Sequence, residues 1–125
     1  MSSFKSFDEI LAWQKARELT KQIYLVSASP AFEKDFGLKD QIRRSSVSVM
    51  ANIAEGYDRR GDKEFVRFLN IAKGSLAEVK SHLFVAVDIN YITREKLDVL
   101  FLLVDEIGRL ISGLIKYLKT ALSTQ

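Results

Sequence analysis

Residues 94–122 read REKLDVLFLLVDEIGRLISGLIKYLKTAL, and this stretch decides the fold. Apolar residues return every three or four positions along it without two-residue alternation, so the pattern predicts an α-helix and not a strand. Thr93, directly before the stretch, is a residue type that caps helix N-termini. The apolar seam consists of Leu97, Phe101, Val104, Gly108, Ile111, Ile115, Leu118 and Leu122, widened by Leu100, Ile107 and Leu114. Such a wide seam is typical of a helix in a bundle, since a two-stranded coiled coil needs a narrower stripe.

Three further helical patterns precede this one, at about residues 7–28, 38–56 and 62–89. Ser6 and Glu9 match a capping box at the start of the first pattern. Pro30, the only proline, is expected to end the first helix before the second pattern begins. Gly56 is a plausible stop for the second pattern, and Asp62 is a suitable N-cap for the third. The third seam consists of Phe65, Leu69, Ala72, Leu76, Val79, Leu83 and Ala86.

Short connections between these patterns force successive helices to run antiparallel. The sequence therefore predicts an all-α fold, an antiparallel up-down-up-down four-helix bundle, with residues 1–125 in a single domain. The chain has no cysteine, which excludes disulfides and thiol catalysis and fits a reducing compartment. We find neither a signal-peptide pattern nor an apolar run long enough to cross a membrane, and we expect a cytoplasmic protein.

Composition and motifs give little support to enzyme chemistry or to a metal site. His82 is the only histidine, so the usual set of transition-metal ligands is missing. No glycine-rich phosphate loop is present, and no hydroxyl–histidine–carboxylate set can be assembled from the spacing. We therefore expect a protein that is not an enzyme and that carries no cofactor and no metal.

The last two helical patterns hold more apolar residues than one bundle core requires. Beyond the seams they carry Val66, Phe68, Ile71, Phe84, Val85 and Val87 in the third pattern, and Val99, Leu102, Leu103, Leu110 and Tyr117 in the fourth. Two interpretations stay open. These residues can be scattered exposed positions on a compact monomer, which are common, or they can form a second face that is buried in a homo-oligomer.

A polar ridge runs along the second helical pattern beside its apolar seam. Its members follow one another by three or four residues and are Gln41, Arg44, Ser48, Asn52, Glu55 and Arg59. A solvated face is the simplest interpretation, but Ser48 and Asn52 are small or amide groups flanked by apolar residues. A covered ridge would need polar partners, and the next helix offers Ser75 and Glu78, with Gly74 allowing a close backbone approach. We therefore predict a structural polar network, including an Arg–carboxylate contact from Arg44 or Arg59 to Glu55 or Glu78.

The same region resembles a known protein family. The resemblance is carried by Phe36-Gly37-Leu38, Gln41, Arg43-Arg44, Ser48, Asn52-Ile53-Ala54-Glu55-Gly56, Arg59, Glu64-Phe65, Phe68-Leu69, Ala72-Lys73-Gly74-Ser75 and Glu78, with Trp13-Gln14-Lys15-Ala16 near the start. It is to the small bacterial four-helix-bundle proteins encoded by intervening sequences within 23S ribosomal RNA genes, a family that includes the accessory variability proteins of diversity-generating retroelements. The resemblance implies a homopentamer without known catalytic activity. Some relatives bind nucleic acid without strong sequence preference and contact a reverse transcriptase.

Two functions follow from these observations and stay open as alternatives. In the first, an oligomer binds RNA or DNA through a basic surface near the second and third helices. Its candidate residues are Arg43, Arg44, Arg59, Arg60, Lys63 and Arg67. The formal net charge of +3 permits this contact without arguing for it, and these arginines can instead pair within the chain. In the second, the oligomer is a scaffold for another protein, such as a reverse transcriptase, and binds no nucleic acid itself.

Overall fold

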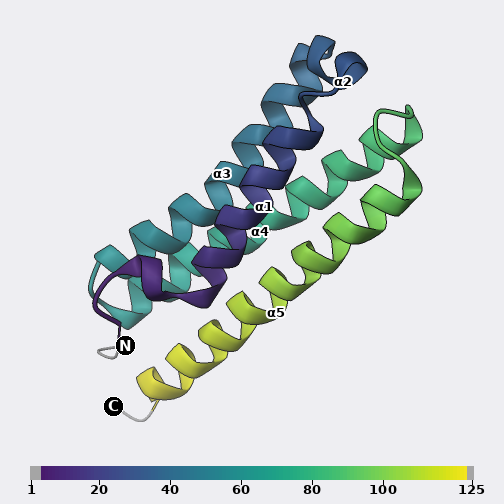
Figure 1. The fold of residues 1–125 in the computed structure, drawn as a ribbon. Coiled ribbons are helices and arrows are strands. Elements are labelled where there is room, and N and C mark those ends of the chain that lie inside the picture. The colour runs from purple at the N-terminus through teal and green to yellow at the C-terminus, as the bar shows by residue number, and fades with distance from the viewer. Residues whose placement is uncertain (1–3, 124–125) are drawn as a thin grey trace.

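The computed structural model describes residues 4–123, and every regular element within them is helical. Four long helices lie side by side (Figure 1): α1 (Leu11–Val26), α3 (Phe36–Asp58), α4 (Asp62–Asp88) and α5 (Arg94–Ser123). A 3-10 turn, η1 (Phe7–Glu9), and a short helix, α2 (Pro30–Lys34), complete the described elements. Helix α1 packs against α3 and α5, and α4 packs against the same two helices, which closes the bundle. The predicted all-α four-helix bundle in one domain is confirmed.

The core is built from the predicted seams. All the seam residues predicted for α4 are buried, from Phe65 at its start to Ala86 near its end. On α5 the inner positions Leu97, Ile107 and Ile111 are fully buried. In the part of the chain that the structure describes, none of the helices has the length and apolar character needed to cross a membrane.

The first helix begins later than predicted, because the capping box does not form. Ile10 is extended, with φ −77° and ψ 121°, and its side chain is buried. The chain before it forms only the 3-10 turn, in which the Ser6 hydroxyl bonds to Asp8 and the Glu9 carboxylate accepts from the Lys5 amide at 3.0 Å. Burial of Ile10 thus sets the helix start at Leu11. The helix ends at Val26 rather than residue 28.

Pro30 breaks the first helix as predicted, but it also begins one. It occupies the first turn of α2, where its missing N–H costs nothing. Ser29 is held extended before it, with ψ 152°. Phe32, fully buried, anchors this short helix to the core. Helix α2 was not predicted from the sequence, since its five residues are too few for a periodic pattern.

The predicted stop at Gly56 is wrong, because α3 continues through this residue to Asp58. The chain leaves the helical region at Arg60, whose φ is +60°. Asn90 takes a φ of +64° after α4, and the Tyr91 amide then donates to the Ala86 carbonyl at 2.8 Å. That bond is the mark of a Schellman ending.

The two predicted N-caps have different outcomes. Asp62 is already the first residue of α4, and Gly61 is the N-cap in its place. Extended backbone at Gly61, with ψ 136°, lets its carbonyl accept the Phe65 amide at 2.9 Å. The Thr93 cap is confirmed, because its hydroxyl accepts the Lys96 amide at 3.1 Å. Helix α3 begins at Phe36, two residues before the predicted Leu38, with Asp35 as its cap.

Candidate interaction surfaces

The centre of the polar ridge faces α4. The Ser48 hydroxyl hydrogen bonds to the Ser75 hydroxyl of α4 at 2.8 Å. The Asn52 amide donates to the Ser48 carbonyl at 2.8 Å and to the Ser48 hydroxyl at 3.0 Å. Ser75 is buried, and Ser48 and Asn52 are partly buried. Ser48, Asn52 and Ser75 of the predicted network therefore form one connected group between α3 and α4.

The charged members of the ridge are not part of this group. Arg44 pairs with Asp40 within α3 at 2.8 Å, and Arg59, the C-cap of α3, pairs with Glu55 at 3.4 Å. Gln41 and Glu78 are exposed, and neither makes a side-chain hydrogen bond or ion pair with any residue from 4 to 123. The predicted Arg–carboxylate contact therefore occurs only along one helix turn, where side chains four residues apart are neighbours.

Gly74 has no close-approach role in this chain. A Cβ placed on Gly74 would meet nothing within 4 Å, whereas one placed on Gly56 would lie 2.6 Å from the Phe68 Cβ and 3.1 Å from the Phe65 ring. Gly56 is therefore the glycine that lets α3 pack closely on α4. Both glycines lie beside polar residues in the sequence, and only the three-dimensional packing tells them apart.

Four of the candidate cations lie around the connection from α3 to α4, and we name Arg59, Arg60, Lys63 and Arg67 the turn cluster. Arg59 and Arg67 lie over the Phe68 ring, at 5.1 and 4.5 Å from its centroid. Arg67 also donates to Glu64 at 2.9 Å. This hydrogen bond lowers the pKa of the Glu64 carboxyl and raises the pKa of the Arg67 guanidinium.

Arg60 and Lys63 differ from their neighbours in the turn cluster. Both are exposed, and neither forms an ion pair with an acidic residue between positions 4 and 123. Arg60 lines a pocket of about 390 Å³ together with Lys5 and the aromatic rings of Phe4, Tyr57 and Phe65. Cations beside aromatic rings are the combination with which proteins hold unpaired nucleic-acid bases.

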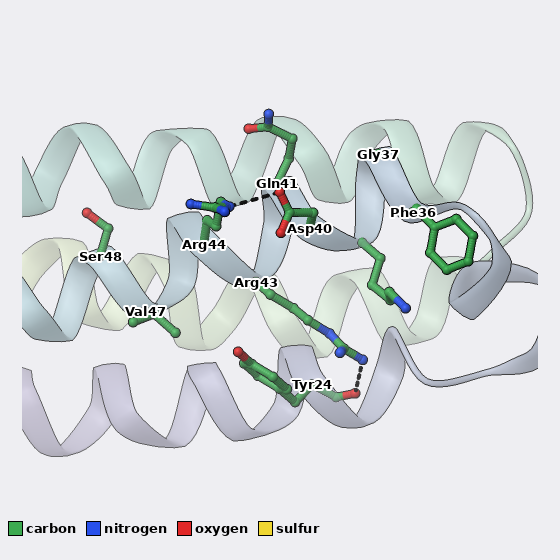
Figure 2. Close-up of a pocket in the computed structure, with 10 residues that line it drawn as sticks. Tyr24, Phe36, Gly37, Asp40, Gln41, Arg43, Arg44, Val47 and Ser48 are labelled. Carbon is green, nitrogen blue, oxygen red and sulfur yellow. Dashed lines mark hydrogen bonds and ion pairs between the residues drawn. The ribbon is translucent and has the colours of Figure 1, made fainter.

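The other two candidate cations, Arg43 and Arg44, lie in a broad groove between α1 and α3 (Figure 2). Arg43 is held within the chain: it donates to the Ser27 hydroxyl at 2.8 Å, lies over the Tyr24 ring at 4.6 Å and is 3.7 Å from Glu33. Arg44 is paired with Asp40. The positive charges of this groove are therefore largely compensated by neighbouring groups.

The same groove exposes apolar surface. Phe36 at the start of α3 is 73% exposed, with the Lys39 ammonium 4.9 Å from its ring centroid, and Val47 is 40% exposed. The groove was not predicted from the sequence, because Tyr24 and Phe36 come from different helices. The one sequence feature that could have indicated this groove is Phe36, an aromatic residue at the start of a helix that belongs to no apolar seam.

The outer stripe of α5 is the third surface. We define it as Val99, Leu102, Leu103, Leu110 and Tyr117, which share a face of α5 other than the one that enters the core. Leu102 is 73% exposed, and Val99 and Tyr117 are each 59% exposed. Leu103 and Leu110 are half-buried. Helix α5 thus carries a second apolar face that its own chain leaves largely uncovered.

Comparison with known proteins gives the chain a family. The family model of the 23S rRNA-intervening sequence protein matches residues 8–113. The chain belongs to this family. A crystal structure of a Bacteroides thetaiotaomicron protein of unknown function, from the S23 ribosomal protein family, is 30% identical with a TM-score of 0.78. The alignment covers 85% of this chain and 96% of that one. No curated protein matches the chain.

The family match covers most of the residues that form these surfaces. Residues 8–113 include the polar ridge, the turn cluster, the groove of Figure 2 and most of the outer stripe. Tyr117 lies beyond the match. Neither the family description nor the description of the Bacteroides protein names a reaction or a ligand. Family membership therefore indicates the fold, and function has to be inferred from the surfaces.

Proposed function

We propose that this chain is a non-catalytic subunit of a cytoplasmic homo-oligomer, and that the oligomer binds nucleic acid through its basic surface. The uncovered outer stripe of α5 is the observation that carries the proposal. The family resemblance in the sequence implies that the oligomer is a pentamer. Residues 4–123 hold no group of three or more His, Asp or Glu residues placed to bind a metal ion.

Burial of the outer stripe supplies the driving force for assembly. Leu102 and Val99 lie one helix turn apart, and Tyr117 lies on the same face nearer the C-terminal end of α5. Removing such apolar surface from water contributes roughly 25 cal/mol per Å². Tyr117 suits an interface, because its ring can be buried while its hydroxyl reaches a polar rim. Contiguous exposed apolar surface of this kind is typical of protein–protein contacts.

The nucleic-acid part of the proposal rests on the turn cluster. Arg60 and Lys63 have no acidic partner among the described residues, so their charge is available to a phosphate. Two free cations make a weak site in a monomer. In an assembly, the same site is repeated in each subunit, and several weak contacts to one polymer combine into tight binding.

The assembly part is tested by size-exclusion chromatography with light scattering. We expect the wild-type protein to have about five times the chain mass of 14.2 kDa. The double variant V99Q/L102Q should elute as a single folded chain. The matched control, F36Q/V47Q, changes two exposed apolar residues in the groove of Figure 2 and should keep the wild-type mass. A wild-type protein that stays monomeric at micromolar concentration would contradict the proposal.

The nucleic-acid part is tested by electrophoretic mobility shift at low salt. We expect the wild-type protein to shift RNA or DNA without strong sequence preference. Binding should weaken steeply with added salt, because each neutralised phosphate releases condensed counterions. If neither RNA nor DNA is shifted at low ionic strength, this part of the proposal fails and the assembly part is unaffected.

A second function, a scaffold for a protein partner, is favoured by the groove of Figure 2. Its arginines are compensated within the chain, while Phe36 and Val47 are exposed, which suits a protein surface better than a polyanion. A reverse transcriptase is the partner that the resemblance suggests. If the groove serves a protein encoded by a neighbouring gene, F36Q/V47Q should abolish co-purification with it and leave nucleic-acid binding intact.

A further inference from the structure

A second basic surface, outside the candidate residues, runs from the groove between α4 and α5 along α5. Two adjoining depressions form it: one of about 460 Å³ lies between α4 and α5, and one of about 430 Å³ is lined by α5 residues alone, with Ser112 lining both. Lys73 enters from α4, and Arg109, Lys116 and Lys119 enter from α5. We name these four cations and the two depressions the α4–α5 groove. Its floor is apolar, with Leu76, Val104 and Ile115 among the lining residues.

The four cations have no acidic partner. Asp105 is the one acidic residue that lines either depression, and it pairs with Lys80 at 3.3 Å. Neither Lys73, Arg109, Lys116 nor Lys119 forms an ion pair with an acid anywhere in residues 4–123. This contrasts with the arginines of α3, which are compensated by neighbouring groups. The α4–α5 groove therefore holds more uncompensated positive charge than the turn cluster does.

The sequence concentrates its positive charge along the groove. The four groove cations lie in residues 68–77 of α4 and residues 107–125, and these two stretches contain four Lys and Arg and no Asp or Glu. The formal net charge of the whole chain is only +3, so the rest of the chain is net negative. A mildly basic protein thus has a strongly basic side. Such a distribution raises the local concentration of anionic ligands.

The spacing of the cations favours a polymer over a small anion. Arg109, Lys116 and Lys119 lie along one side of α5, and at ~1.5 Å per residue they cover about 15 Å of helix. Cations that recognise a single phosphate converge on one point, whereas these form a line. A line of point charges matches the regular phosphate spacing of a nucleic-acid backbone.

The residues that line the two depressions also favour double-stranded over single-stranded nucleic acid. None of the residues that line the two depressions is aromatic. Proteins that hold single strands combine a basic groove with aromatic side chains on which bases stack. A duplex keeps its bases stacked internally and presents phosphates alone, which lysine can contact without any aromatic platform.

We infer that the α4–α5 groove binds the phosphate backbone of double-stranded nucleic acid. This rests on the nucleic-acid part of the proposed function and moves the main contact from the turn cluster to the groove between α4 and α5. Recognition is through charge and duplex shape, without reading of base edges. The pocket beside Arg60, which does contain aromatic rings, is not part of this duplex-binding surface.

Three double variants with equal reduction of charge separate the possible binding sites. K116Q/K119Q removes two groove cations, R60Q/K63Q removes the free cations of the turn cluster, and K21Q/K34Q removes two exposed lysines elsewhere. Each is compared with wild type for affinity to a short duplex RNA, the same duplex as DNA, one of its single strands, and poly-glutamate. Light scattering and circular dichroism confirm that each variant keeps the wild-type assembly and helix content.

We expect K116Q/K119Q to raise the duplex Kd on the order of tenfold and to flatten the salt dependence by roughly one unit of slope for each phosphate that is no longer neutralised. R60Q/K63Q should weaken binding by a smaller factor, K21Q/K34Q should stay close to wild type, and wild type should prefer the duplexes. If R60Q/K63Q alone weakens binding, the proposed function stands and the groove assignment is wrong. Equal affinity for single strands or poly-glutamate also overturns it. Absence of any wild-type binding removes the groove and the nucleic-acid function together.

Discussion

Gly56 is the residue whose identity the fold constrains most closely. It lies inside α3, buried, against Phe65 and Phe68 of α4. A methyl group there would lie 2.6 Å from the Phe68 Cβ, which is close to the backbone of α4 and cannot rotate away. Because real Cβ contacts are longer than this, the two helices would have to separate locally.

We expect Gly56→Ala to lower the free energy of unfolding by roughly 1–3 kcal/mol, as overpacking does. The matched change Gly74→Ala lies in a helix interior with open space around it. It should raise stability by about 0.5–1 kcal/mol, because alanine loses less backbone entropy than glycine. Urea unfolding followed by circular dichroism measures both. Equal effects of the two substitutions would show that the packing of α3 on α4 does not require a glycine at position 56.

Asp35 links the start of α3 to the connection between α4 and α5. One carboxylate oxygen accepts the Leu38 amide at 3.1 Å, and the other accepts the Tyr91 hydroxyl at 3.0 Å. Tyr91 also packs on Phe32 of α2, with ring centroids 5.1 Å apart. The hydrogen bond to Asp35 raises the pKa of the Tyr91 hydroxyl, and partial burial adds to the shift.

This contact predicts a pH dependence with a definite sign. Because the folded-state pKa of Tyr91 is above the unfolded value of about 10, the hydrogen bond stabilises the fold fully below about pH 10. The stabilisation is lost as pH rises through the raised pKa. We therefore expect Tyr91→Phe to lower the urea midpoint at neutral pH, with the difference from wild type shrinking in strong alkali. Tyr24→Phe, which removes a hydroxyl that makes no hydrogen bond with residues 4–123, should leave the urea midpoint at neutral pH unchanged.

At the scale of elements, the predicted capping box at Ser6 and the predicted N-cap at Thr93 make a direct comparison. Thr93 caps α5 through the Lys96 amide, whereas the Ser6 hydroxyl bonds to Asp8 and caps no helix. Thr93→Ala should therefore cost about 1 kcal/mol of stability, and Ser6→Ala should stay within about 0.5 kcal/mol of wild type. Unfolding in urea tests the pair. A larger destabilisation by Ser6→Ala would mean that Ser6 does cap the first helix.

The seams of α4 and α5 could be predicted because each repeats over many turns, and burial then follows from periodicity. The start of α1 could not, because burial of the single residue Ile10 overrides a local capping signal. An ion pair between residues four apart, such as Arg59 with Glu55, competes with ion pairs between helices. Spacing in the sequence does not show which of the two forms. The α4–α5 groove could not be predicted because Lys73 of α4 comes near the three cations of α5 only when the two helices pack.

At the scale of the whole molecule, we expect self-assembly and nucleic-acid binding to be coupled if the protein has the proposed function. In the proposed assembly, one subunit would offer a few phosphate contacts and the other subunits would repeat them on a single polymer, which can increase affinity by about 10²–10⁴ without any new contact. The outer stripe contains no charged residue. A substitution there that separates the subunits should therefore weaken nucleic-acid binding while leaving every lysine and arginine in place.

V99Q/L102Q should accordingly raise the Kd for duplex RNA by a factor on the order of 10² or more, and F36Q/V47Q should leave it unchanged. The salt dependence separates this effect from damage to the binding site itself. If the monomer binds with the same charges but fewer copies, its salt slope should fall in proportion to the number of subunits that touch one duplex. Gel shift across a salt series, paired with light scattering on the same samples, measures both quantities. A monomeric V99Q/L102Q that binds duplex RNA as tightly as the wild-type assembly would show that one subunit carries the complete site.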